Sequence, residues 1–228
     1  MENIIIVSTS HVAKESVERV KRTIAEEKPE IVAVELDPNR LMGLFQKQRS
    51  IPISAIFKIG IASYLFFTIA RILQQKIGRM VGVMPGAEMK AAVMAARDSG
   101  AKIALIDRRI EVTVQRLTKA LTWREKFRFA ADFFNGLLGR GEVMELNKFD
   151  LAKVPPSEVI TGVMNYMKRR YPSIYRVLVA ERDEIMAKNL IEISRVEQGK
   201  KIVAVVGAGH EEGLRSRLSE EFKKLKRD

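Results

Sequence analysis

The stretch VAVVGAGHEEG, residues 203–213, decides the fold. A short run of β-branched residues stops at a Gly-x-Gly turn, which is followed by His210 and a charged segment typical of a helix. The N-terminus repeats this order, because the run IIIV at 4–7 leads through STS at 8–10 to His11. His11 and His210 are the only histidines in the chain. Each follows a predicted buried strand, so we expect the fold to bring both ends of the chain into one site.

Composition indicates a globular protein with no cysteine chemistry. Of the 228 residues, 46% are apolar and 30% are charged, and there is no Cys to form a disulfide or a thiolate. A net charge of +12 leaves two interpretations open: an anionic partner, or an ordinary solvated surface. A nucleic-acid partner is disfavoured, since aromatic residues do not alternate with the basic clusters at 168–170 and 223–227. The first apolar run is only four residues long and has no basic leader, so we expect no signal peptide and a cytoplasmic or membrane-associated protein.

Hydrophobic periodicity predicts an α/β fold with a largely parallel central sheet flanked by helices. The order strand 4–7, helix 12–28 and strand 31–34 makes a βαβ unit, which requires parallel strands. Further strands are predicted at 80–84, 102–106 and 201–206, with helices at 85–99 and 211–226. The region from about 111 to 198 has a helical pattern and is predicted to be an insertion between strands. We therefore expect residues 1–228 to form a single domain.

The apolar segment within 51–79 allows more than one interpretation. Its centre, 51–73, is strongly hydrophobic and has basic flanks. Lys58 and Arg71 leave only about a dozen uncharged residues between them, fewer than the ~18 that a membrane span needs. We favour a helix buried against the core or against another subunit in a homo-oligomer. Docking on a membrane surface is the alternative.

The carboxyl ends of the predicted strands point to a metal site. Ligands bind at this edge of parallel sheets, where His11, Glu35 and His210 are expected to meet. Both histidines fall at helix starts, where the helix dipole disfavours an imidazolium, so we expect neutral rings that can bind a metal or accept a proton. Two neutral histidines and a carboxylate make a plausible open site for a divalent metal of the Mn, Co or Zn class. The alternatives are hydrogen-bonded loop histidines, and a helix-capping role for Glu35.

Two further charged residues fall where burial is expected. Arg182 lies in the middle of the apolar face of its predicted helix, so it needs a partner or a polar cavity. It is predicted either to hold a carboxylate, phosphate or oxyanion of a substrate, or to form a structural ion pair. Glu88 is in the first turn of a helix whose small residues favour close packing, and it is predicted to act as general base or acid. The alternative for Glu88 is a favourable contact with the helix dipole.

The Gly-x-Gly turn is also similar to a dinucleotide-binding loop, but it departs from that pattern. The third glycine of the pattern should stand at 212, which is Glu212, and Gly213 comes one residue late. No further strand follows to supply the acidic residue that binds a ribose. Nucleotide binding is therefore disfavoured.

Several motifs together resemble the TraB family. This group includes pheromone-shutdown proteins and is related to the TIKI, GumN and erythromycin-esterase/ChaN-like proteins. Its two Gly-x-x-His motifs correspond to GAGH at 207–210 and STSH at 8–11, the second with Ser in place of the first Gly. Its second-strand signature resembles VELD at 34–37, and its Glu-bearing helix start resembles PGAEM at 85–89. Its Arg-bearing helix resembles ERDEIMA at 181–187, so the resemblance covers nearly the whole chain.

The resemblance implies an α/β core and a metal-dependent, peptidase-like hydrolase, with inactivation of a signalling peptide as one expected role. His11, Glu35 and His210 are then expected to hold the metal, with Glu88 as general base and Arg182 as substrate-binding residue. The expected partner is a peptide or small carbonyl substrate. Similar members often continue into hydrophobic C-terminal segments, so membrane association through such a segment or through 51–73 is also expected. A non-catalytic peptide- or anion-binding protein and a membrane-docked scaffold are the alternatives.

Overall fold

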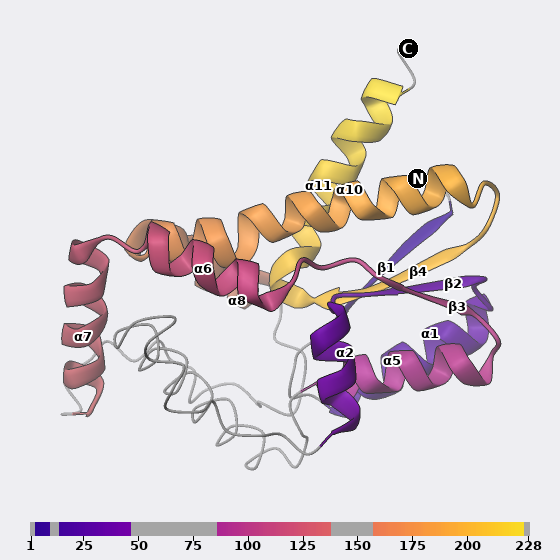
Figure 1. Ribbon diagram of the computed structural model, residues 1–228, viewed down its shortest axis with the longest axis horizontal. Helices are drawn as coiled ribbons and strands as arrows, with labels where there is room; N and C mark the ends of the chain where they lie inside the picture. The colour runs from indigo at the N-terminus through magenta and orange to yellow at the C-terminus, as the bar shows by residue number, and fades with distance from the viewer. Residues whose placement is uncertain (1–2, 10–13, 47–85, 138–156, 226–228) are drawn as a thin grey trace.

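The core of the chain is a parallel four-stranded sheet. In the computed structural model, the described residues are 3–9, 14–46, 86–137 and 157–225. The strands are β1 (Ile4–Thr9), β2 (Ile31–Val34), β3 (Lys102–Leu105) and β4 (Ile202–Gly207). They lie in the order β1-β4-β2-β3, and every pairing is parallel (Figure 1). The predicted α/β fold is confirmed, and the last strand pairs with the first.

Helices cover both faces of the sheet. On one face, α1 (Lys14–Glu27) and α5 (Ala87–Asp98) pack side by side over a core that includes Val32, Val34 and Val203. On the other face, α10 (Glu181–Val196) and α11 (Ala208–Leu225) pack over Ala33, Ala204 and Val206. Successive side chains of a strand point to opposite faces, so the apolar runs of β2 and β4 fill both cores.

The chain between β3 and β4 is largely helical where the structure describes it. Its helices are α6 (Ile110–Ala120), α7 (Trp123–Leu137), α8 (Ser157–Arg170) and α9 (Pro172–Tyr175). A π-helical turn, η3 (Arg176–Ala180), follows α9 and leads without a break into α10. Figure 1 shows α7 at the end of the molecule farthest from the sheet.

Three local features differ from the sequence-based expectation. The helix predicted from 111 breaks already at Leu121 and Thr122, because Thr122 and Glu125 form reciprocal side-chain to backbone hydrogen bonds that begin α7. A short helix, α2 (Pro38–Phe45), follows β2; Asp37 caps it by accepting from two backbone N–H groups. The last helix begins at Ala208 rather than at 211, which places His210 inside its first turn.

The predictions for 51–79 and for a strand at 80–84 lie outside the described residues. No helix in the described part of the chain is long and apolar enough to span a membrane.

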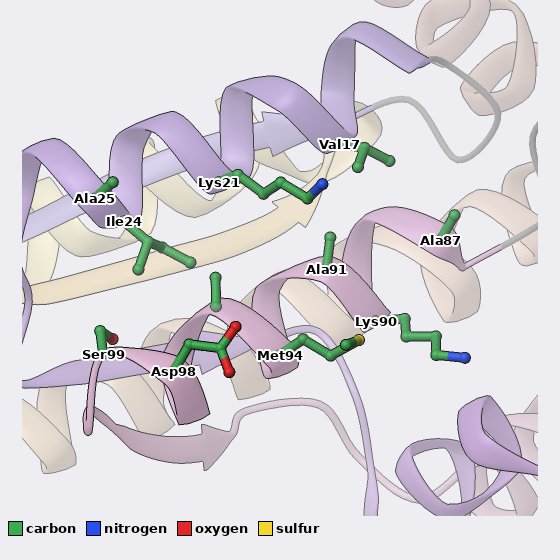
Figure 2. Close-up of a pocket in the computed structure, with 11 residues that line it drawn as sticks. Val17, Lys21, Ile24, Ala25, Ala87, Lys90, Ala91, Met94, Asp98 and Ser99 are labelled. Carbon is green, nitrogen blue, oxygen red and sulfur yellow. The ribbon is translucent and has the colours of Figure 1, made fainter.

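A groove of about 700 Å³ runs between α1 and α5 (Figure 2). Apolar side chains line it, among them Val17, Ile24, Ala91 and Met94, with Lys21 also on its wall. The small side chains of α5 leave this space between the two helices. Among the described residues, none of those predicted to form the functional site lines this groove.

Truncation of the sheet-facing side of α10 should destabilise the fold strongly. Leu190 is fully buried in the core beneath α10 and α11, so Leu190→Ala removes apolar contacts and leaves a cavity. We expect a loss of about 2–5 kcal/mol in the free energy of unfolding, measured by urea titration with circular dichroism. Val196→Ala is the control, because Val196 ends the same helix and is 76% exposed. Equal losses in the two variants would contradict this packing.

Candidate functional site

Polar residues that follow β2, β3 and β4 meet Arg182 of α10 at the carboxyl edge of the sheet. Glu35 follows β2, Asp107 follows β3, and His210 stands in the first turn of α11 just after β4. The backbone keeps β2 and β3 together beyond their last ladder pair, since Asp107 N donates to Leu36 O at 3.3 Å. Glu35 Oε2 accepts from Gly207 N at 2.6 Å, which ties β2 to the end of β4.

The Arg182 guanidinium occupies the centre of this polar cluster. Its Nη2 donates to Glu35 Oε1 and, at 2.7 Å, to Asp107 Oδ2. Its Nη1 donates to Leu178 O at 3.1 Å and lies 3.0 Å from His210 Nε2, while Nε donates to Asp107 at 3.1 Å. All five N–H donors of a guanidinium therefore have a protein acceptor here.

Arg182 keeps its charge although it is largely buried. Burial alone opposes the cation, but the nearby carboxylates of Glu35 and Asp107 outweigh it and raise the pKa of Arg182 above its ordinary value. Arg40 adds a second cation, which donates to Asp107 Oδ2 at 2.9 Å. The cluster thus pairs buried carboxylates with two arginines.

His210 is held in one orientation by Asp183. Its Nδ1 lies 2.6 Å from Asp183 Oδ1, and its Nε2 faces Arg182 Nη1 at 3.0 Å. An arginine N–H can only donate, so Nε2 must accept with its lone pair, and Nδ1 carries the proton that is donated to Asp183. In this tautomer the Nε2 lone pair points into the cluster, 3.4 Å from Glu35 Oε1.

Gly213 makes room for the Asp183 carboxylate. It lies one turn beyond His210 in α11, and a Cβ built at this position would come within 2.1 Å of Asp183 Oδ2. Contacts this short do not occur between non-bonded atoms, so no larger residue fits while Asp183 stays in place. The glycine that comes one residue late for a nucleotide loop therefore allows close packing of α11 on α10.

The π-helical turn η3 ends at Ala180, with one residue between it and the pair Arg182 and Asp183. Wider turns of this kind recur at functional sites because they change the direction in which later side chains point. Arg108 holds this region by donating to Val177 O at 2.7 Å and to Glu181 Oε2 at 2.8 Å. Arg116 binds the same carboxylate, so Glu181 is anchored immediately before the two site residues.

The structure brings three of the five predicted site residues into one cluster: Glu35, Arg182 and His210. His11 lies outside the described residues, so its distance from His210 is not part of this geometry. Glu88 stands in the first turn of α5 and is 1% exposed, but its neighbour Met89 belongs to the core on the other face of the sheet. Among described residues, no group of three or more His, Cys, Asp or Glu side chains is arranged to hold a metal ion. The roles predicted for these five residues therefore stay predictions.

No role was predicted for three members of the cluster: Asp107, Asp183 and Arg40. Asp107 directly follows the strand predicted at 102–106, so its position at the carboxyl edge of the sheet was expected, as it was for Glu35. Asp183 lies three, four and seven residues before the buried Met186, Ala187 and Leu190 of α10, so helical spacing was a signal that could have identified it. Arg40 belongs to the short helix α2, which hydrophobic periodicity did not predict.

The chain matches the profile of the TraB/PrgY/gumN family over residues 2–221. It belongs to this family. A similar protein of Methanocaldococcus jannaschii, itself described as uncharacterized, is 38% identical over 219 residues, which cover 93% of this chain and 52% of that protein. TraB domain-containing proteins of Bos taurus and Homo sapiens are 29% and 26% identical, over 92% and 94% of this chain. The match covers 60% and 62% of those two proteins, so the chain spans between half and two thirds of the length of these relatives.

Substitution of Gly213 should change the tautomer of His210 and lower the stability of the fold. In Gly213→Ala, the new methyl group must displace the Asp183 carboxylate, so we expect a loss of about 1–3 kcal/mol in unfolding free energy and a changed His210 tautomer. Urea titration and the ring ¹⁵N shifts of His210 measure these effects. Gly162→Ala in α8 is the control, since a Cβ there meets nothing within 4 Å. An unchanged tautomer in Gly213→Ala would argue against this packing.

Glu181 should make stability depend on acid pH. Its hydrogen bond with Arg116 lowers the pKa of Glu181 from 4.5 to about 2, with Arg108 adding to the effect. The contribution of the ionised carboxylate is present above pH 4.5 and is lost as the pH falls toward 2. Glu181→Gln should therefore be less stable than the original chain above pH 4.5, and the difference should shrink toward pH 2. Urea titrations across this range test it, with Glu18→Gln, at a 77% exposed side chain, as control; a difference that does not change with pH would contradict it.

Proposed function

We propose that the chain carries a metal-dependent hydrolase centre for peptides or similar carbonyl substrates, where Glu35, Arg182 and His210 meet. The observation that carries the proposal is the orientation of His210. Asp183 binds its Nδ1–H, and the lone pair of Nε2, which faces Arg182 Nη1, lies beside Glu35 Oε1. A carboxylate bound to the distal nitrogen is the usual support of metal-binding and catalytic histidines.

The spacing of two donor atoms fits a metal ion. Two ligand atoms bonded to a tetrahedral metal at about 2.0–2.1 Å lie about 3.3–3.4 Å apart. Glu35 Oε1 and His210 Nε2 are separated by 3.4 Å. These two atoms would hold the ion, and the resemblance assigns a further ligand to His11. Because the described residues supply fewer than the three protein ligands of a catalytic site, the proposal depends on His11.

Each residue of the cluster has a separate role in this proposal. A bound metal ion would lower the pKa of its water toward about 7 and polarise a substrate carbonyl. Asp183 keeps the His210 ring in the tautomer whose Nε2 carries a lone pair, and Gly207 N fixes the Glu35 carboxylate. Arg182 places a positive charge beside the donor pair, where it would stabilise a substrate carboxylate or a developing oxyanion.

The roles proposed for Arg182 and Glu88 each require a change from the contacts or the burial in this structure. All N–H donors of Arg182 already have protein acceptors, so binding a substrate requires it to exchange one of them. Glu88 as general base must reach the reacting water from α5, although it is 1% exposed. The cluster around His210 therefore supports the proposal more directly than Glu88 does.

Metal binding tests the donor pair without any substrate. Titration of the purified chain with Co²⁺, followed by visible absorption, should show one site that is lost in Glu35→Gln, His210→Ala and His11→Ala. Asp183→Asn should weaken binding by about 10–100-fold, as expected for a residue that orients a ligand. Glu18→Gln and Asp98→Asn are controls at exposed positions. Folding of each variant is checked by circular dichroism, and equal Co²⁺ binding in the controls and the site variants would overturn the proposal.

Peptide cleavage tests the reaction. A mixture of unrelated peptides, incubated with the chain and Mn²⁺, Co²⁺ or Zn²⁺, should give metal-stimulated cleavage detected by mass spectrometry. His210→Ala should abolish this cleavage, and the chelated protein should lose it reversibly. Tight peptide binding without turnover would instead support a non-catalytic binding protein.

A further inference from the structure

Helix α7 exposes two aromatic side chains on one face. Trp123 is 72% exposed and Phe127 is 71% exposed, and only one other large apolar side chain among the described residues exceeds them. The two residues are one turn apart, and their ring centroids lie 6.1 Å from each other. Single exposed apolar residues are common, but two adjacent aromatic rings form a patch that indicates an interaction surface.

The acidic residues of α7 point away from this patch. Glu125 is 3% exposed and accepts from Ser173 N at 2.8 Å. Asp132 binds Arg170 at 2.5 Å and accepts from the Tyr171 hydroxyl. Both carboxylates are thus used to fasten α7 to the start of α9 and the end of α8.

Basic residues flank the aromatic patch on both sides. With about 100° between successive residues, Arg124 and Lys126 fall on opposite sides of the line through Trp123 and Phe127. The Lys126 ammonium lies 4.5 Å from the centroid of the Trp123 ring, and Lys119 is exposed just before α7 begins. The outer face of α7 therefore combines apolar rings with basic side chains.

We propose that α7 docks on the surface of an anionic lipid bilayer through Trp123 and Phe127. Tryptophan prefers the boundary between acyl chains and head groups, and the long side chains of Lys and Arg extend from there to phosphates. A second copy of this chain fits less well, because a symmetric contact between two α7 helices would bring their cations together. Figure 1 shows α7 at the end of the molecule farthest from the sheet, and both aromatic side chains are exposed there. This proposal depends on neither the proposed hydrolase activity nor residues 51–73.

The only tryptophan of the chain reports directly on this contact. Because Trp123 is the single Trp, fluorescence excited at a wavelength that tyrosine does not absorb observes α7 and no other helix. Vesicles of phosphatidylcholine with phosphatidylglycerol should shift its emission to the blue and protect it from acrylamide. Phosphatidylcholine alone should give neither effect, and salt should weaken the binding. Brominated lipids in the anionic vesicles should quench Trp123.

Charge reversal separates this surface from general attraction by the net charge of +12. Arg124→Glu with Lys126→Glu should reduce partitioning into anionic vesicles by about tenfold or more. Lys14→Glu with Lys21→Glu makes the same charge change at exposed positions of α1 and should reduce it clearly less. Equal losses in the two double variants, or unchanged emission with anionic vesicles, would overturn the proposal. A blue shift that appears only when the protein is concentrated, or only with single-stranded RNA, would overturn it in favour of that partner.

Discussion

The buried positive charge of Arg182 is the constraint on which the carboxyl edge of the sheet depends. A guanidinium taken out of water is costly unless charged and polar partners surround it. Glu35 and Asp107 supply the opposite charges, and Leu178 O and His210 Nε2 accept further hydrogen bonds. These partners come from β2, β3, η3 and α11, so one side chain holds together segments that are far apart in the sequence. Loss of any one carboxylate would leave a buried cation partly uncompensated.

Much of the local backbone follows from placing Arg182 and Asp183 side by side. Consecutive residues of a regular helix point about 100° apart, yet both side chains must reach the same cluster. Both residues lie in the regular helix α10, and the absence of a side chain at Gly213 leaves room for the Asp183 carboxylate where α11 packs on α10. Arg108 and Arg116 bind Glu181, the residue just before this pair. The site thus rests on close helix packing supported by a second set of ion pairs.

The sequence predicted the parts of this structure that depend on regular periodicity. Apolar runs located all four described strands, and the parallel topology then explained why Glu35 and His210 meet. The burial of Arg182 followed from its place on an apolar helical face, although the pattern left open whether it would form an ion pair or bind a substrate. Features without periodicity were missed: the helix break at Thr122, which its capping hydrogen bonds with Glu125 produce, and the π-helical turn η3 before α10.

The same donor atoms cannot serve Arg182 and a metal ion fully at once. Glu35 Oε1 and His210 Nε2 both face the guanidinium, and a metal ion between them would add a second positive charge. Arg182 nevertheless keeps three hydrogen bonds when those two are removed: two to Asp107, and one to Leu178 O. Asp107 therefore serves as an independent anchor for the buried charge. This division of partners, with Asp107 for the arginine and the Glu35–His210 pair for the proposed metal ion, would let one small cluster accommodate both charges.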